Sequence, residues 1–280
     1  MKAKLVAGLV AIALGGFTSC GNILEENGVI NNVAQNGTGE LRINLNQDPS
    51  VNVISKAGSF DGSKVTLTED EIGDFNITVS DVTGLDGKYK EIKDKTATAS
   101  AGEHTISATY GSMSGDFAFD IPCFSGTQSV TVKANEVVTG NVTCKLSNSI
   151  IVIDAEALNS FKNDATITNI VAITGAVDNE TNLSSGTSLL DTEKELKAGT
   201  LYVKSDLTDA KIVLDGVLKN DTSRKFRAIA NIKSGTNAGA GNKYNVKYTL
   251  STSQGSLKIT INVNGDVSEV SVPVSIDPYK

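Results

Sequence analysis

The sequence predicts an all-β protein, and three observations support this fold class. Apolar and polar residues alternate with a period of two along much of the chain, as in strands with one buried face. Val, Ile and Thr are abundant, and their branched Cβ atoms suit a pleated sheet. Turn-forming residues recur about every ten residues, a spacing that favours β-sandwiches. We therefore expect two tandem β-sandwich domains.

The first twenty residues have the layout of an export signal. Lys2 and Lys4 form a basic start, and residues 5–14 form an apolar run that is too short to span a bilayer. Small residues then precede a cysteine, which is the pattern of a bacterial lipobox. We expect residues 1–19 to be a lipoprotein signal peptide that is removed. Cys20 would then carry acyl chains such as palmitate and anchor the protein in the outer membrane.

The remaining chain divides into three parts. Residues 20–38 are rich in Asn and Gly and predict a flexible tether. An N-terminal sandwich is expected over residues 39–148 and a C-terminal sandwich over residues 149–280. The chain is long enough for both to form cores of their own.

The net negative charge of the chain argues against two classes of partner, nucleic acid and anionic lipid surfaces. The full chain has a net charge of −7, and removing Lys2 and Lys4 leaves 23 basic against 32 acidic residues, or −9. An acidic surface argues against nucleic acid and against electrostatic binding to anionic lipid. Apart from the signal, no segment approaches the about 18 apolar residues of a membrane span.

Strands of the first half are placed by the alternation, beginning where Leu41, Ile43 and Leu45 share one face. They are expected over residues 40–46, 51–53, 65–67, 75–79, 104–111, 129–133, 137–146 and 150–153. Residues 60–63 predict a turn, because Gly tolerates positive φ and Asp bonds its own backbone. Residues 85–88 predict a hairpin tip, with Tyr89 and Ile92 on the returning strand.

One helix is expected, over residues 154–161, at the start of the second domain. Asp154 would be its N-cap, and Ala157, Leu158 and Phe161 have helical spacing. Further strands are expected over residues 167–173, 201–203, 210–218, 226–232, 244–250, 257–263 and 267–274. Residues 181–192 predict turns and 235–241 a loose connection, and tight turns are expected at Gly255 and at 264–265.

Two cysteines remain after Cys20. Cys123 and Cys144 belong to an exported chain, where disulfides form, and a bridge between them would stabilise by about 3 kcal/mol. The alternative is that they are small apolar residues that never meet, since spacing alone does not give pairing geometry.

Residues suited to catalysis or metal binding are sparse. His104 is the only histidine, and its place in an alternating strand favours a packing role over that of a base. No G-x-S-x-G turn is present, and one histidine with two cysteines does not give a zinc spacing. The acidic run 69–74 lacks the order of a calcium loop and predicts a solvated turn. With few aromatics and no Trp, glycan hydrolysis is disfavoured. We expect no catalytic residues, metal or cofactor.

Four stretches of the first half, 101–111, 119–122, 124–134 and 142–148, carry a family resemblance. In this order they resemble an uncharacterised Bacteroidales lipoprotein family, a domain of unknown function, from about residue 39 to the C-terminus. Residues 241–246 and 257–263 are similar in outline. Cys123 departs from the pattern where an aromatic is expected, which favours packing over a bridge.

This resemblance extends to fimbrillin-like surface lipoproteins with two immunoglobulin-like or transthyretin-like sandwiches. It implies a non-enzymatic, structural or adhesive envelope protein. An acidic pair, Glu25 and Glu26, resembles a surface-export tag and favours cell-surface display, with a periplasm-facing position as the alternative.

Two other functions stay open. The first is a pilus subunit that self-assembles by strand exchange, with trimming at Arg42 and residues 267–276 as the donor strand. Arg42 is otherwise an outward-facing strand residue, as the alternation indicates. The second is a carbohydrate-binding surface lipoprotein, so that the partner is a protein or a glycan.

Overall fold

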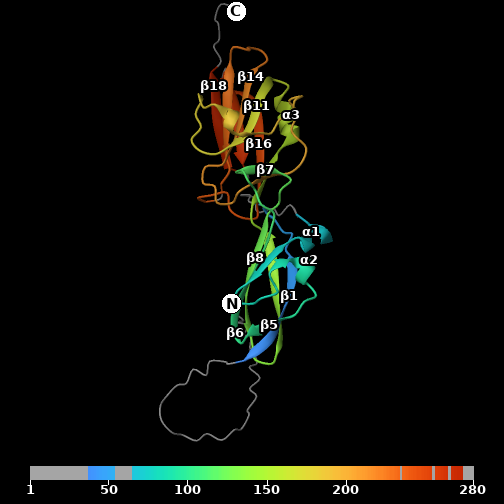
Figure 1. Cartoon of the computed structure of the whole chain (residues 1–280). Helices are drawn as coiled ribbons and strands as arrows, with labels where there is room; N and C mark the ends of the chain where they lie inside the picture. The colour runs from blue at the N-terminus through green and yellow to red at the C-terminus, as the bar shows by residue number, and fades with distance from the viewer. Residues whose placement is uncertain (1–36, 54–64, 234, 254–255, 264–265, 274–280) are drawn as a thin grey trace, which may run out of the picture. The chain divides into compact units, whose positions relative to one another are not determined.

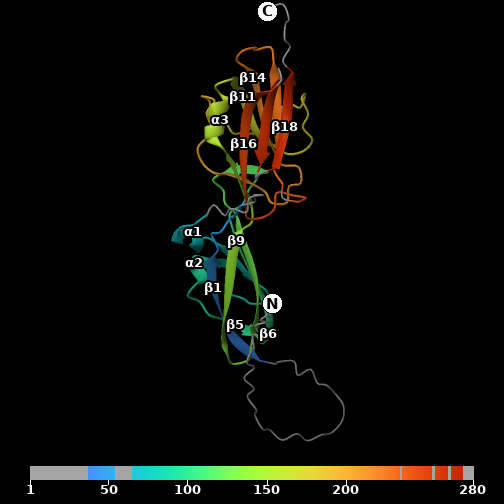
Figure 2. The same ribbon diagram turned by 180° about the vertical axis from the view of Figure 1, so that it is seen from behind.

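The computed structural model of the chain describes residues 37–53, 65–233, 235–253, 256–263 and 266–273. Residues 35–280 form one compact unit, which Figures 1 and 2 show from two sides. Its regular elements are mostly strands, which confirms the predicted all-β class. Several predictions lie outside the described residues: the signal peptide, Cys20, most of the tether, and the turns at 60–63, 255 and 264–265.

The N-terminal half forms most of a first sandwich. Its strands pair in the order β4-β3-β6-β8-β9-β1-β5. They are β1 (Thr38–Gln47), β3 (Asn76–Val79), β4 (Gly87–Lys88), β5 (Ala97–Ser100), β6 (Gly102–Tyr110), β8 (Phe124–Val132) and β9 (Val137–Leu146). β8 pairs with β9 only at Phe124 and Ser125. Side chains from β3, β6 and β8 and from β9, β1 and β5 together form one buried core.

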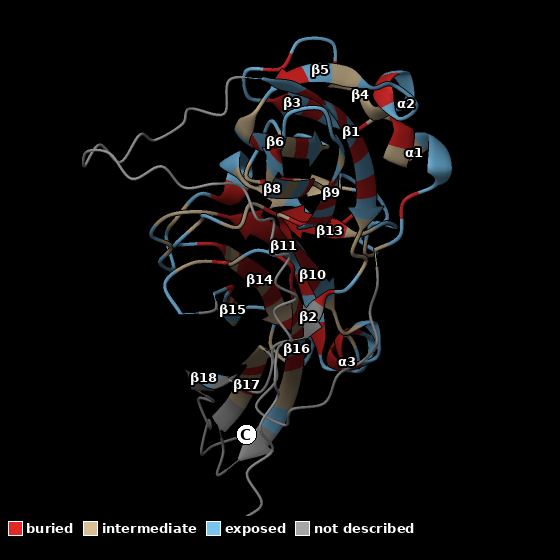
Figure 3. Ribbon diagram, turned by 90° about the horizontal axis from the view of Figure 1, so that it is seen from below, coloured by how far each residue is buried: buried red, intermediate tan, exposed pale blue. Residues whose placement is uncertain are grey.

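β1 shows why these residues form strands. Buried and exposed residues alternate along it, as Figure 3 shows, and Leu41, Ile43 and Leu45 face the core. It pairs in parallel with β9 and antiparallel with β5. The same alternation runs through β9, where Gly140 leaves space for Ile106 of β6, because that side chain lies where a Cβ would be. Period-two patterning thus places one face of each strand in the core.

Two short helices in this sandwich were not predicted. α1 (Glu69–Gly73) replaces the solvated turn expected at 69–74, because Thr68 and Glu71 form a capping box at its start. α2 (Tyr89–Ile92) replaces the returning strand expected after 85–88. The two helices lie side by side in Figures 1 and 2. The expected hairpin exists as β3 and β4, but its turn spans residues 80–86, so Gly87 and Lys88 are already on the return.

Two sheets form a second sandwich. One has the order β18-β17-β16-β10-β13-β7, and the other β12-β11-β14-β15. The strands of the first sheet are β7 (Phe117–Phe119), β10 (Ser149–Ile153), β13 (Leu201–Val203), β16 (Asn242–Ser253), β17 (Ser256–Val263) and β18 (Asp266–Pro273). Those of the second are β11 (Ala165–Ile173), β12 (Thr187–Ser188), β14 (Lys211–Leu218) and β15 (Lys225–Asn231).

The predicted helix is confirmed as α3 (Ala155–Phe161). Asp154 is its N-cap, with the carboxylate accepting from the Ala157 N–H at 2.9 Å. Leu158 and Phe161 enter the core of the second sandwich, where Phe161 meets Phe226 edge-on with centroids 5.6 Å apart. A 3₁₀ turn (Leu183–Ser185) lies in the region expected to be turn-like.

Two short strands that precede residue 148 in the sequence belong to the second sandwich in the structure. The expected division after residue 148 falls between β9 and β10. However, β2 (Asn52–Val53) pairs in parallel with β16, and β7 pairs with β13. Both segments precede residue 148 and complete the first sheet of the second sandwich.

Candidate functional site

The lone histidine is a structural residue of the first sandwich. His104 is buried, with Nδ1 3.0 Å from the Ser80 carbonyl oxygen and Nε2 2.8 Å from that of Ser100. Both ring nitrogens therefore face backbone oxygens. This arrangement ties the end of β3 and the end of β5 to β6, in keeping with the predicted packing role. No lone pair is directed at a hydroxyl that it could activate.

The two described cysteines are free thiols, so the bridge that the sequence left open is not formed. Cys144 is buried in the core of the first sandwich, where its Sγ lies 3.9 Å from the Ala108 carbonyl oxygen. Burial raises the pKa of the Cys144 thiol to about 12. Cys123 is half-buried, and burial raises the pKa of its thiol too. Neither is poised as a nucleophile at neutral pH.

In denaturant without reductant we expect two titratable thiols per chain, those of Cys123 and Cys144. Cys20 should add none, because its sulfur would carry the acyl anchor. In the folded protein Cys144 should stay unreactive toward an aromatic disulfide reagent, because it is buried and protonated. Absorbance titration before and after unfolding measures both quantities. Cys123→Ser is the control and should lower the unfolded count by one. A count of zero that rises by two on reduction would show a bridge.

Arg42 lies on the outer side of β1, as the alternation predicted. Its Nε donates to the Thr96 hydroxyl at 2.7 Å, and its backbone pairs in register with Thr139 of β9. Leu41, one residue before it, is fully buried. Proteolytic processing at Arg42 therefore requires β1 to leave its neighbours before a protease can bind it.

Two acidic residues of this region, Glu71 of α1 and its C-cap Asp74, form contacts within the fold. The Glu71 carboxylate accepts from the Thr68 N–H at 2.8 Å and from the Tyr110 hydroxyl at 3.2 Å, and these bonds, led by that to Thr68, lower its pKa. Asp74 pairs with Lys90 at 2.8 Å. Within the described residues no group of three potential metal ligands occurs. In the same part of the chain, no helix is long and apolar enough to cross a bilayer.

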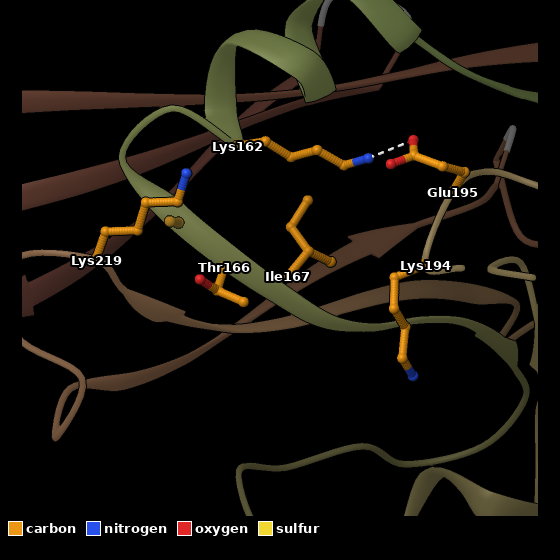
Figure 4. A pocket seen from close by; sticks show the side chains of 7 residues that line it. Lys162, Thr166, Ile167, Lys194, Glu195 and Lys219 are labelled. Carbon is orange, nitrogen blue, oxygen red and sulfur yellow. Dashed lines mark hydrogen bonds and ion pairs between the residues drawn. The ribbon is translucent and has the colours of Figure 1, made fainter. Parts of the chain in front are cut away.

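A groove beside β11 gathers cations that the sequence did not single out. Lys162, Lys194, Glu195 and Lys219 surround the strand segment 165–167, and the cavity measures about 210 Å³. Figure 4 shows the Lys162 side chain reaching Glu195, with Lys219 and Lys194 at opposite ends of the row formed by Thr166 and Ile167.

Different elements supply these side chains. Lys162 caps the end of α3, and Lys219 follows β14, where its N–H donates to the Asp164 carbonyl at 2.9 Å. Lys194 and Glu195 lie in a tight turn closed by the Leu190–Leu196 bridge, with Lys194 at a φ of 64°. Because four separate segments meet here, no sequence motif could have revealed the groove.

The electrostatics of the groove are uneven. Lys162 Nζ lies 2.6 Å from Glu195 Oε2, and Lys194 Nζ donates to the Thr168 carbonyl at 3.5 Å. Lys219 forms no ion pair with any acid in the described part of the chain. The lining carries three positive charges and one negative, on a chain whose net charge is −7.

A second, more apolar cavity of about 160 Å³ lies between β7, β10 and the segment 196–201. Lys197 Nζ sits 5.8 Å from the centroid of the Phe119 ring, within cation–π range. Val152 is exposed beside it. This cavity has few polar groups that could orient a ligand.

Comparison with known proteins gives a family and a set of similar structures. The family model described as Domain of unknown function (DUF4493) matches residues 37–278. No curated protein matches the sequence. The chain is similar to the fimbrial anchor protein Mfa2 from Porphyromonas gingivalis, at 11% identity and a TM-score of 0.39, over 82% of this chain and 98% of that one. It is also similar to a fimbrial assembly protein from Parabacteroides distasonis, at 10% identity and a TM-score of 0.39, over 84% and 97% of the two chains.

Proposed function

We propose a function from one premise: the chain belongs to the DUF4493 family, a domain of unknown function, as its motifs predicted. The protein is a lipid-anchored component of the cell envelope. It works by making contacts at the cell surface, in a structural or adhesive role, and not by catalysis. Its N-terminal acyl chains hold it in the outer membrane, and its sandwiches present the contact surfaces.

The observation that carries this proposal is the place of Cys20 in the sequence, after the signal and before the residues of the family match. The family match begins at residue 37 and β1 begins at Thr38, so residues 20–36 separate the lipobox cysteine from the sandwiches. Such a segment, rich in Asn and Gly, is suited to a flexible link. Two or more acyl chains on Cys20 would give stable anchoring, which one chain does not.

The surface of the first sandwich supports a contact role. The outward residues of β1 are polar, and Asn44 donates from Nδ2 to Asn141 Oδ1 of β9 at 3.0 Å. The outer side of β1 therefore exposes polar and charged side chains, among them Arg42 and Asn44. The histidine that a hydrolase would use is enclosed between two carbonyl oxygens.

Protease treatment of intact cells tests surface display. We expect proteinase K to digest the protein without lysis, while a periplasmic marker survives. The double variant Glu25→Gln, Glu26→Gln should stay lipidated but become protected, because it removes the acidic pair that resembles a surface-export tag close behind the anchor. A wild-type protein that is digested only after lysis would place it on the periplasmic side and overturn surface display.

A further inference from the structure

The apolar cavity of about 160 Å³ beside β7 and β10 lies where the pairing of β10 with β13 stops. The last pair between these strands is Ile151 with Leu201. In the same register the next pair would be Ile153 with Gly199, and it is not formed. Both of these residues line the cavity. The cavity therefore lies at an interruption in the sheet.

The backbone groups of Ile153 are directed to this interruption. Asp154 donates its N–H to the Val246 carbonyl of β16 at 2.9 Å. Successive residues in a strand direct their groups to opposite sides, so Ile153 directs its N–H and C=O away from β16. Neither group has a hydrogen-bond partner among the residues that the structure describes. Ile153 is partly exposed and Val152 is exposed, which leaves this stretch of β10 accessible.

Asp120 fixes the chain at residues 199–200, on the far side of the interruption. Its N–H donates to the Thr200 carbonyl at 2.9 Å, and the Thr200 N–H donates to its carboxylate at 2.7 Å. These bonds hold Thr200 on the side of β7. Gly199 has a φ of 104°, and the Asp120 carboxylate lies where a Cβ would be, so only glycine fits there. Gly199 is exposed, and since it has no side chain, its exposed surface is backbone.

The lining of the cavity selects an aliphatic group. Phe119, Leu189 and Leu196 are among the apolar side chains that line it. Its volume is below the about 300–1,000 Å³ of pockets for drug-sized ligands, so it suits one large side chain better than a whole ligand. A sugar ring would bury hydroxyl groups against these side chains without hydrogen bonds, which is unfavourable.

We propose that this cavity binds an extended segment of a partner protein that carries a large aliphatic side chain and, two residues away, an acidic one. The main chain of the segment would pair with Ile153 as an added strand. Its aliphatic side chain would fill the cavity, and its carboxylate would pair with the exposed Lys197, which also lines the cavity. This inference rests on the proposed surface-contact function and names a partner chemistry for it.

The backbone chemistry favours a peptide over other aliphatic acids. The N–H and C=O of one residue are matched by the C=O and N–H of another main chain, as in strand addition. A fatty acid would fill the cavity and pair with Lys197, but it would leave the Ile153 groups without partners. Side chains of an extended chain alternate between two faces, so two that enter the same cavity are two residues apart.

Fluorescence anisotropy of labelled pentapeptides with the purified full chain tests the proposal. The peptides Thr-Leu-Thr-Glu-Thr and Thr-Glu-Thr-Leu-Thr cover both strand directions, and we expect at least one to bind. Replacing its leucine by serine should weaken binding at least about tenfold, because the cavity loses its aliphatic group. Methylating the leucine amide nitrogen should weaken binding about fivefold, because the Ile153 carbonyl loses its donor. Hydrogen exchange over residues 150–154 should become slower with the bound peptide.

Protein variants test the charge contact. Lys197→Gln should weaken binding of the acidic peptide about threefold at low salt, since an exposed ion pair contributes little. It should not change the binding of the same peptide with glutamine in place of glutamate. Lys194→Gln is the matched control and should bind like the wild type, because Lys194 lies in the same turn but lines the groove beside β11.

Four results would overturn the proposal: no binding of either peptide, equal binding of the serine peptide, equal binding of the methylated peptide, or unchanged binding by Lys197→Gln. Binding of hexanoate without binding of either peptide would also reject it, in favour of a free aliphatic acid. The mass of the mature chain and cell shaving judge anchoring and display without any peptide. Failure of peptide binding is therefore distinguishable from failure of the proposed surface-contact function.

Discussion

Replacing Tyr248 by alanine should destabilise the protein by about 3–5 kcal/mol, the usual cost of removing a large buried aromatic side chain. Tyr248 lies on β16 and is almost fully buried in the core of the second sandwich. Its hydroxyl donates to the Ile212 carbonyl of β14 at 3.1 Å. One side chain therefore fills the space between the two sheets and bonds them together.

Conservative variants separate packing from hydrogen bonding. Tyr248→Phe keeps the ring but removes one hydrogen bond to a buried carbonyl, which should cost about 0.5–1.5 kcal/mol. Tyr110→Phe is the control: its hydroxyl bonds Glu71 at a partly exposed position, so the loss should be smaller. Urea unfolding followed by circular dichroism measures all three variants. A Tyr248→Ala protein as stable as the wild type would contradict the described packing.

Alkaline pH gives an independent readout of the same residue. Burial raises the pKa of Tyr248 well above its ordinary value of about 10, and burial also raises that of Tyr202 to about 12. Above pH 10 the unfolded chain therefore loses tyrosine protons that the folded chain keeps. The contribution of these buried tyrosines to the free energy of unfolding is complete below pH 10 and is lost as pH rises through their raised pKa values. Tyr248→Phe should lose less stability between pH 9 and pH 11 than the wild type.

Cys20→Ala should abolish acylation and, with it, lipid anchoring in the outer membrane. Without the thiol no acyl chain can be attached, and lipobox cleavage should not follow. We expect the uncleaved chain, still carrying residues 1–19, with no incorporation of a labelled fatty acid. Cys123→Ala and Cys144→Ala are matched controls and should label like the wild type. A correctly trimmed, soluble Cys20→Ala product would contradict lipobox processing.

Strands with regular alternation could be predicted because the pattern reports one buried face directly. β1, β9 and β15 all occur where apolar residues recur every second position. The α3 helix was predictable from an N-cap and helical spacing. Short elements were harder to predict. The start of α1 could have been predicted, because Thr68 and Glu71 have the spacing of a capping box.

Pairing between distant segments could not be predicted. β2 and β7 are two and three residues long, and each finds its partner in the second sandwich. The strand expected over residues 51–53 contains β2, but nothing local shows that β16 is its partner, because the pairing depends on the rest of the sheet. The groove beside β11 has the same origin, since Lys162 and Lys219 line it together only once β11 and β14 have paired.

The mass of the purified mature protein tests the central claim most directly. Lipid anchoring at Cys20 predicts a chain that begins at residue 20, carrying the added mass of two or three acyl chains on its first residue. An unmodified cysteine at the N-terminus, or a chain that begins elsewhere, would contradict it.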